Sequence, residues 1–88
     1  MPNHPIARSP EKLHTWLAER VASYVQRDPQ EIKPDVPLAE YGLSSVYALS
    51  LSGEIEDFLG ISLDPTVVWD YPTIEKLAAV LLAELATA

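Results

Sequence analysis

The chain has 88 residues, of which 48% are apolar and none is cysteine, and its formal net charge is −7. This length allows one small domain with a core, and the lack of cysteine excludes disulfides, thiolate metal sites and thiol nucleophiles. The negative charge argues against nucleic acid and anionic membranes as partners. Because no apolar run is long enough to span a bilayer, we expect a monomeric cytoplasmic protein.

The first predicted element is an amphipathic helix over about residues 10–26, in which apolar residues recur at three- and four-residue spacing. Ser9 is a suitable N-cap, and Pro10 fits the first helical position. Residues 1–9 are expected to form a flexible tail, and residues 10–86 a single domain.

A proline-rich stretch and a second helix follow. Residues 27–43 contain three prolines and few periodic apolar positions, which predicts one long ordered loop with a single turn at 38–41. A helix is predicted over about 45–59, with Ser44 as its N-cap and Gly60 as the residue that ends it.

The helix predicted over 45–59 has one apolar face and one mixed face. Its core stripe comprises Ala48, Leu51, Ser52, Ile55, Phe58 and Leu59. The opposite arc comprises Val46, Tyr47, Ser50, Gly53, Glu54 and Asp57. Such an arc is either an ordinary solvated face or a binding face, and the pattern alone does not separate the two.

Two more helices complete the predicted fold. A short helix is expected over 65–69 after Asp64, and a last, strongly periodic helix begins after the cap residue Thr73. Trp69 and Tyr71 are expected to pack the short helix onto the bundle. Since no segment alternates with a period of two, the fold class is all-α: a small four-helix bundle of three longer helices and one short one.

The acidic residues are concentrated in the middle of the chain. Residues 28–75 contain ten acidic side chains and one basic side chain, a net of −9, whereas residues 1–27 have a net charge of +2. An acidic surface of this kind favours partners with basic surfaces.

Ser45 stands in the first turn of the second predicted helix, just after a glycine. Backbone N–H groups there lack partners within the helix, and the helix dipole favours negative charge, so a phosphate can be accommodated. Gly42 leaves room for a large enzyme to approach the backbone. A serine at a helix start is most often only a cap, so this feature alone does not define a site.

Three separated sequence elements supply the missing context. Tyr-Gly-Leu-Ser-Ser-Val at 41–46 resembles the Gly-x-Asp-Ser-Leu signature of acyl carrier proteins and of the carrier domains of polyketide synthases. Residues 35–41 are similar to the stretch before that signature, and Trp-Asp-Tyr-Pro-Thr-Ile at 69–74 resembles the element that opens the last carrier helix. The likeness extends from about residue 13 to 85 and favours the polyketide-synthase branch.

The resemblance implies a carrier and not an enzyme, without catalytic residues or a metal site of its own. In that family the serine bears 4′-phosphopantetheine, which a phosphopantetheinyl transferase places there from coenzyme A with magnesium. The matching position is Ser45, and Gly42, Leu43 and Ser44 surround it. The arm holds acyl or polyketide intermediates, or fatty acyl groups, as thioesters.

The resemblance also implies docking to other enzymes, such as acyl-loading enzymes and ketosynthases. Val46 and Tyr47 are expected to make apolar contacts near the arm. Glu54, Glu56 and Asp57 are expected to pair with basic residues of the partners, in weak and fast encounters.

The chain departs from the family signature at two positions, where Ser44 replaces an aspartate and Val46 replaces a leucine. Register after Gly42 favours Ser45 over Ser44 as the modified residue. Two alternatives stay open, namely a peptidyl carrier for amino acids and a carrier-like helical adaptor that is never modified. A small hydrolase using Ser45 lacks a histidine partner nearby.

Overall fold

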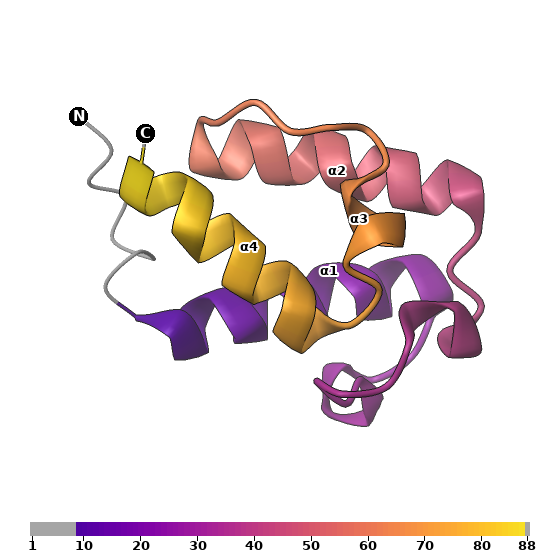
Figure 1. Ribbon diagram of the computed structural model, residues 1–88. Coiled ribbons are helices and arrows are strands. Elements are labelled where there is room, and N and C mark those ends of the chain that lie inside the picture. Colours follow the sequence, from indigo (N-terminus) through magenta and orange to yellow (C-terminus); the bar gives the residue numbers. More distant parts are fainter. Residues whose placement is uncertain (1–8, 88) are drawn as a thin grey trace.

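The computed structural model describes residues 9–87, and within that range the backbone forms helices and no strand (Figure 1). The three longer helices are α1 (Pro10–Val25), α2 (Ser45–Leu59) and α4 (Ile74–Thr87), and the short helix is α3 (Val67–Asp70). The connection between α1 and α2 contains two 3₁₀ turns, η2 (Pro29–Glu31) and η3 (Leu38–Tyr41). The predicted all-α bundle is therefore confirmed.

The helices pack around one apolar core. Helices α1 and α2 run antiparallel, α4 crosses α1, and α3 packs against α2 (Figure 1). Fully buried side chains from these elements and the long connection include Leu13, Leu17, Leu38, Leu51, Ile55, Val68, Ile74, Leu77, Leu81 and Leu85. This arrangement leaves one face of α2 toward solvent.

Helix α1 begins at Pro10 after Ser9, as predicted, but it differs in how Ser9 caps it and in where it ends. The backbone carbonyl of Ser9 accepts the N–H of Lys12 at 3.0 Å, but within the described residues its hydroxyl makes no capping hydrogen bond. Pro10 occupies the first turn, where a missing N–H costs nothing. The helix ends one residue earlier than predicted, because Gln26 adopts a left-handed conformation with φ +58°.

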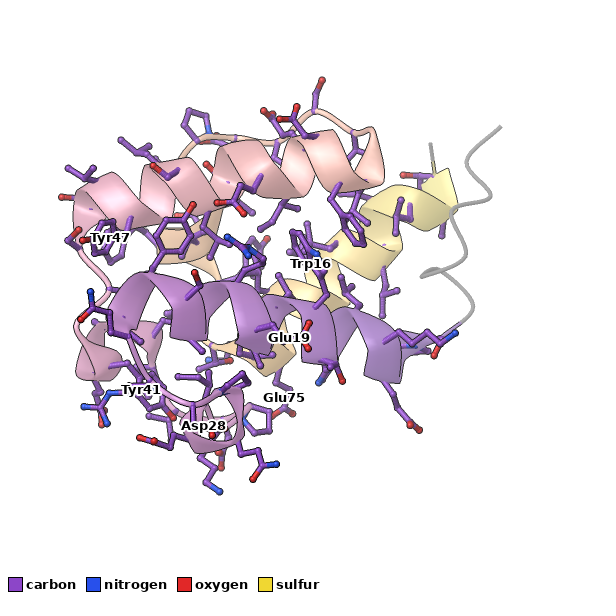
Figure 2. All side chains as sticks on the ribbon, turned by 180° about the vertical axis from the view of Figure 1, so that it is seen from behind. Trp16, Glu19, Asp28, Tyr41, Tyr47 and Glu75 are labelled. Atoms are coloured by element: carbon purple, nitrogen blue, oxygen red, sulfur yellow. The ribbon has the colours of Figure 1, made fainter. Side chains whose placement is uncertain are left out.

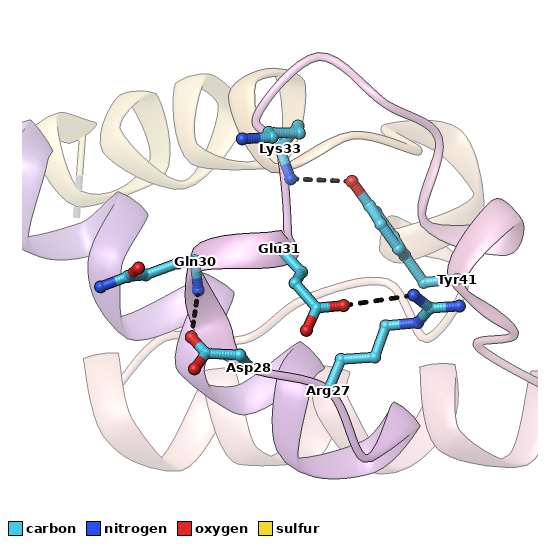
Figure 3. A network of polar contacts seen from close by, with 6 residues as sticks. All are labelled: Arg27, Asp28, Gln30, Glu31, Lys33 and Tyr41. Carbon is cyan, nitrogen blue, oxygen red and sulfur yellow. Dashed lines mark hydrogen bonds and ion pairs between the residues drawn. The ribbon is translucent and has the colours of Figure 1, made fainter.

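The predicted long loop is more structured than its sequence suggests. Asp28 accepts the N–H of Gln30 at 2.9 Å, which starts η2 (Figure 3). The N–H of Lys33 donates to the phenol oxygen of Tyr41 at 2.8 Å. The Arg27 guanidinium lies 5.8 Å from the centre of the Tyr41 ring. These contacts fold the connection upon itself, and η3 confirms the turn expected at 38–41.

Two backbone hydrogen bonds tie this connection to the start of α4. The N–H of Leu38 donates to the carbonyl of Pro72 at 2.8 Å, and the N–H of Glu75 donates to the carbonyl of Pro34 at 2.9 Å. The segment that leads into α2 is thereby fixed to a distant part of the chain.

The turn before α3 explains why that helix begins later than predicted. Asp64 accepts hydrogen bonds from the N–H of Thr66 at 2.9 Å and from its hydroxyl at 2.7 Å, which lowers the pKa of the carboxyl. These bonds form an Asx turn, so the helix begins after Thr66 and not after Asp64. The cap predicted for α4 is confirmed, since the Thr73 hydroxyl oxygen accepts the N–H of Lys76 at 3.1 Å.

The aromatic residues near α3 do not pack as expected. Val67 and Val68 are buried and hold α3 against the bundle, whereas Trp69 and Tyr71 remain 43% and 39% exposed. A helix of one turn has only one inward side, and the two valines occupy it.

The described part of the chain contains neither a membrane-spanning helix nor a cluster of metal-ligating side chains. No helix within residues 9–87 is long and apolar enough to cross a membrane. In the same range, no group of three or more His, Asp or Glu side chains is placed to hold a metal ion. Of the tail predicted over 1–9, all but Ser9 lies outside the described residues.

Candidate attachment site at the start of helix α2

A glycine turn directs the chain into α2. Gly42 ends η3 with φ +89°, a left-handed conformation that a residue with a Cβ adopts only under strain. Its N–H donates to the carbonyl of Ala39 at 3.0 Å. Leu43 follows and is only 4% exposed, so it anchors the turn in the core. The backbone conformation of Gly42 and the buried Leu43 together set where α2 begins.

The two serines that follow have different surroundings. The Ser44 hydroxyl oxygen accepts the N–H of Tyr47 at 3.2 Å, and the Ser44 carbonyl accepts the N–H of Ala48 at 2.8 Å. Ser44 is therefore the N-cap, as predicted, and serves the helix as an aspartate would. Ser45 is the exposed first residue of α2, and its hydroxyl makes no hydrogen bond to any described residue.

The start of α2 also suits a phosphodiester. In an α-helix, the N–H groups of its first residues, here Ser45 and Val46, have no intrahelical acceptor and point toward the helix start. The helix dipole adds favourable interaction with negative charge. Along α2 no acidic side chain precedes Glu54, so the helix itself places no carboxylate beside Ser45 to repel a phosphate. The residues present therefore fit a covalently attached phosphopantetheine.

An exposed leucine lies close to Ser45 and was missed by the sequence analysis. Leu49 is 52% exposed, although the helical pattern assigned it to neither the core stripe nor the outer arc. It stands four residues after Ser45, so the two side chains are neighbours on the helix surface. Val46 is 67% exposed, as the pattern indicated. The helical pattern placed the buried Leu51 in the core stripe and left Leu49 unassigned, and the four-residue spacing from Ser45 was the signal that could have found it.

Glu54, expected to face partners, is bound within the chain. The Nε of Arg20 donates to one Glu54 carboxylate oxygen at 2.7 Å, and the Tyr24 hydroxyl donates to the other. Burial, followed by this hydrogen bond, raises the pKa of Tyr24. The rings of Tyr24 and Tyr47 also meet, with centroids 5.2 Å apart. We call these four residues the α1–α2 seam.

A second aromatic contact extends this junction toward the other end of α1. Trp16 stacks on Phe58 with ring centroids 4.1 Å apart and planes only 6° from parallel. Figure 2 shows Trp16 from α1 and Tyr47 from α2 both pointing into the space between the two helices. The two helices are thus joined by aromatic and charged side chains that remain partly open to solvent.

The other two predicted docking acids differ from each other. One Glu56 carboxylate oxygen accepts the N–H of Leu63 at 2.7 Å, which ties α2 to the following loop. Asp57 is exposed, and its carboxylate has no hydrogen bond or ion pair to any residue in 9–87. The docking role of these acids stays a prediction, with Asp57 the freest of the three.

Replacing Glu54 by alanine is expected to lower the free energy of unfolding by about 1.5 kcal/mol, because it removes two charge-assisted hydrogen bonds at a half-exposed site. Urea unfolding followed by tryptophan fluorescence measures this loss. The Asp57→Ala variant is the control and should change stability by less than about 0.5 kcal/mol. Equal effects of the two substitutions would show that the α1–α2 seam adds nothing to stability.

A second stability prediction concerns Gly53, in the middle of α2. A Cβ built at Gly53 meets no described atom outside its own helix turns within 4 Å, and the residue lacks a positive φ. We therefore expect Gly53→Ala to raise the free energy of unfolding by about 0.5–1 kcal/mol, since alanine restricts the unfolded chain and favours the helix. A lower thermal midpoint for the variant, measured by circular dichroism, would contradict this expectation.

Comparison with known proteins shows which family the chain resembles. The family described as "Phosphopantetheine attachment site" matches residues 15–81. A phenolphthiocerol/phthiocerol polyketide synthase polypeptide of Mycobacterium tuberculosis is 41% identical over 71 residues, which are 81% of this chain and 4% of that protein. The 6-methylsalicylic acid synthase of Aspergillus terreus is 33% identical over 81 residues, covering 86% of this chain and 4% of that protein. The chain thus spans a small fraction of these relatives.

Solved structures show the same fold. A free-standing peptidyl carrier protein from an Acinetobacter baumannii secondary metabolic pathway is 42% identical, with a TM-score of 0.79, and the match covers 83% of this chain and 91% of that one. The HMG-ACPI domain of the CurA module of Lyngbya majuscula shares the fold at 22% identity, with a TM-score of 0.82, over 90% of this chain and 80% of that one.

The helical bundle and the family match over residues 15–81 together identify the chain as a carrier domain. The chain belongs to the phosphopantetheine attachment site family, whose prosthetic group is covalently bound 4′-phosphopantetheine. Its relatives include polyketide synthases, which confirms the resemblance to carrier domains of the polyketide-synthase branch.

Proposed function

We propose that this chain carries acyl or polyketide intermediates as thioesters on a 4′-phosphopantetheine arm attached to Ser45. The observation that supports this site is that the two adjacent serines have different roles. Ser44 uses its hydroxyl oxygen to cap α2, whereas the exposed Ser45 hydroxyl makes no hydrogen bond to the residues described. Ser45 can therefore enter another active site without breaking the helix cap.

The attachment reaction transfers the phosphopantetheine group of coenzyme A to the serine, and it involves no oxidation or reduction. The Ser45 hydroxyl oxygen bonds to the phosphorus that bears the pantetheine in coenzyme A, and adenosine 3′,5′-bisphosphate leaves. The serine proton passes to a base of the transferase. This chain contributes the hydroxyl, the free N–H groups of the first turn and the helix dipole.

In this proposal the chain has no catalytic residues of its own. The thiol of the arm holds the acyl group, and partner enzymes such as acyl-loading enzymes and ketosynthases perform the chemistry. Asp57, and to a smaller extent Glu56, are placed to pair with basic residues of those enzymes. The supply of coenzyme A and magnesium that the reaction requires fits the cytoplasm.

A peptidyl carrier is the second candidate function. The free-standing peptidyl carrier protein that matches at 42% identity favours it. The relatives named as polyketide synthases support the acyl version. Because the arm and its serine are common to both functions, the distinction depends on which enzyme loads the thiol.

Intact-mass measurement tests the proposal directly. The purified protein is incubated with coenzyme A, magnesium and a broad-specificity phosphopantetheinyl transferase, beside a known carrier protein as control. We expect the wild-type chain to gain the mass of one phosphopantetheine. If the control is modified and this folded chain is not, the proposal fails and the unmodified helical adaptor becomes the better description.

A further inference from the structure

The phenol of Tyr41 joins the two 3₁₀ turns that lie between α1 and α2 (Figure 3). Its oxygen accepts the backbone N–H of Lys33 at 2.8 Å, just beyond the end of η2. The Arg27 guanidinium lies 5.8 Å from the centre of the Tyr41 ring and 3.3 Å from the Glu31 carboxylate. We call Arg27, Glu31, Lys33 and Tyr41 the Tyr41 clasp. Through this clasp, the end of η3 is held against the residues that follow α1.

The Tyr41 clasp lies directly before the turn that leads to Ser45. Tyr41 is the last residue of η3, and Gly42 follows it with φ +89°. Apart from its two chain neighbours, a Cβ built at Gly42 would meet no atom of the described residues within 4 Å. Because glycine has the widest conformational freedom of any residue, the direction of the chain at Gly42 has to be fixed by the residues on either side.

Each side of Gly42 has its own anchor. After the glycine, Leu43 is buried in the core. Before it, η3 is fixed at its beginning by the buried side chain of Leu38 and at its end by the phenol of Tyr41. The Gly42 N–H donates to the carbonyl of Ala39 inside η3, so Gly42 moves together with that turn. Removing the phenol oxygen therefore releases the end of η3 and, with it, the turn at Gly42.

We propose that Tyr41 is a positioning residue for the attachment reaction, because it holds the turn at Gly42 and thereby keeps the Ser45 hydroxyl in the geometry of attack. This inference rests on the proposed function, since it requires that Ser45 be modified. Tyr41 acts through the backbone of the turn and not by contact with the reacting atoms. It raises the fraction of bound carrier in which the hydroxyl oxygen is aligned with the phosphorus, so it affects the rate within the complex and not the affinity.

Single-turnover kinetics test this inference, with transferase, coenzyme A and magnesium all in excess over the carrier. The Tyr41→Phe variant removes the oxygen that accepts the Lys33 N–H and keeps the aromatic ring. We expect its rate at saturating transferase to fall about fivefold, because the hydroxyl is aligned less often. The transferase concentration that gives half of this rate should change less than about twofold.

Tyr24→Phe is the matched control, because it also removes one hydrogen-bonded phenol oxygen and keeps the ring. In this case the lost partner is Glu54 in the α1–α2 seam, nine residues beyond Ser45 along α2. The saturating rate of this variant should stay within about twofold of wild type. Thermal unfolding verifies that both variants are folded at the assay temperature.

Amide hydrogen exchange, followed by NMR, measures the Tyr41 clasp itself. In Tyr41→Phe the N–H groups of Lys33 and Gly42 should exchange at least about threefold faster than in wild type, because the local structure opens more often. In Tyr24→Phe both groups should exchange as in wild type.

Failure of this inference can be told from failure of the function on which it rests. If wild-type protein is never modified, the proposed function fails and this inference fails with it. If wild-type protein is modified but Tyr41→Phe reacts at the wild-type rate, or Tyr24→Phe is slowed equally, the carrier stands and Tyr41 has no positioning role. A slower Tyr41→Phe variant without faster exchange at Lys33 would also overturn the inference, because the effect would then not pass through this hydrogen bond.

Discussion

The Ser45→Ala variant is expected to gain no phosphopantetheine under conditions that modify the wild-type chain completely. The hydroxyl is the bond-forming group, and alanine leaves no oxygen at that position. Because the Ser45 hydroxyl makes no hydrogen bond within the described structure, its removal should leave the fold unchanged. Intact mass after incubation with coenzyme A, magnesium and a transferase measures the effect, and circular dichroism verifies the helices.

Ser44→Ala provides the matched control, because it removes the same atom from the adjacent residue. This variant loses the cap on the N–H of Tyr47, which should lower the free energy of unfolding by about 1 kcal/mol. Its modification should nevertheless proceed to completion. Modification of Ser45→Ala, or its loss in a folded Ser44→Ala variant, would assign the arm to Ser44.

The sequence predicted the parts of the site that depend on local interactions. Ser44 caps α2, and Gly60 ends it with φ +68°, because both roles involve residues within one turn of each other. The periodic burial of α2 was also predicted, apart from Phe58, which is only partly buried and stacks on Trp16. Local chemistry and helical spacing were enough for these features.

Features that depend on distant residues could not be predicted in this way. Glu54 lies on the outer arc of an isolated helix, but in the fold that side of α2 meets Arg20 and Tyr24, at least 30 residues earlier. The 3₁₀ turn η2 was missed for a different reason, because it depends on a local hydrogen bond from the Gln30 N–H to the Asp28 side chain in a stretch without apolar periodicity. The spacing of apolar residues predicts which face of each helix is buried, but it does not predict which other parts of the chain pack beside that helix.

The Leu43→Ala variant is expected to lose about 3 kcal/mol of unfolding free energy, the typical result of removing a buried leucine and leaving a cavity. Leu43 is 4% exposed and belongs to the core, although it lies in the turn just before the two serines. For a domain of this size that loss is a large part of the total stability. The midpoint of urea unfolding, at an unchanged denaturant dependence, measures it.

Leu49→Ala is the matched comparison, since it truncates the same side chain on the other side of Ser45. Leu49 is half exposed, so its truncation should change stability by less than about 0.5 kcal/mol. The two leucines thus serve different purposes at the same site, one for stability and one for contact with other proteins. Leu43 fixes the start of α2 from inside, whereas Leu49 is free to contact a partner from outside. Equal losses of stability in both variants would mean that Leu43 does not anchor the turn.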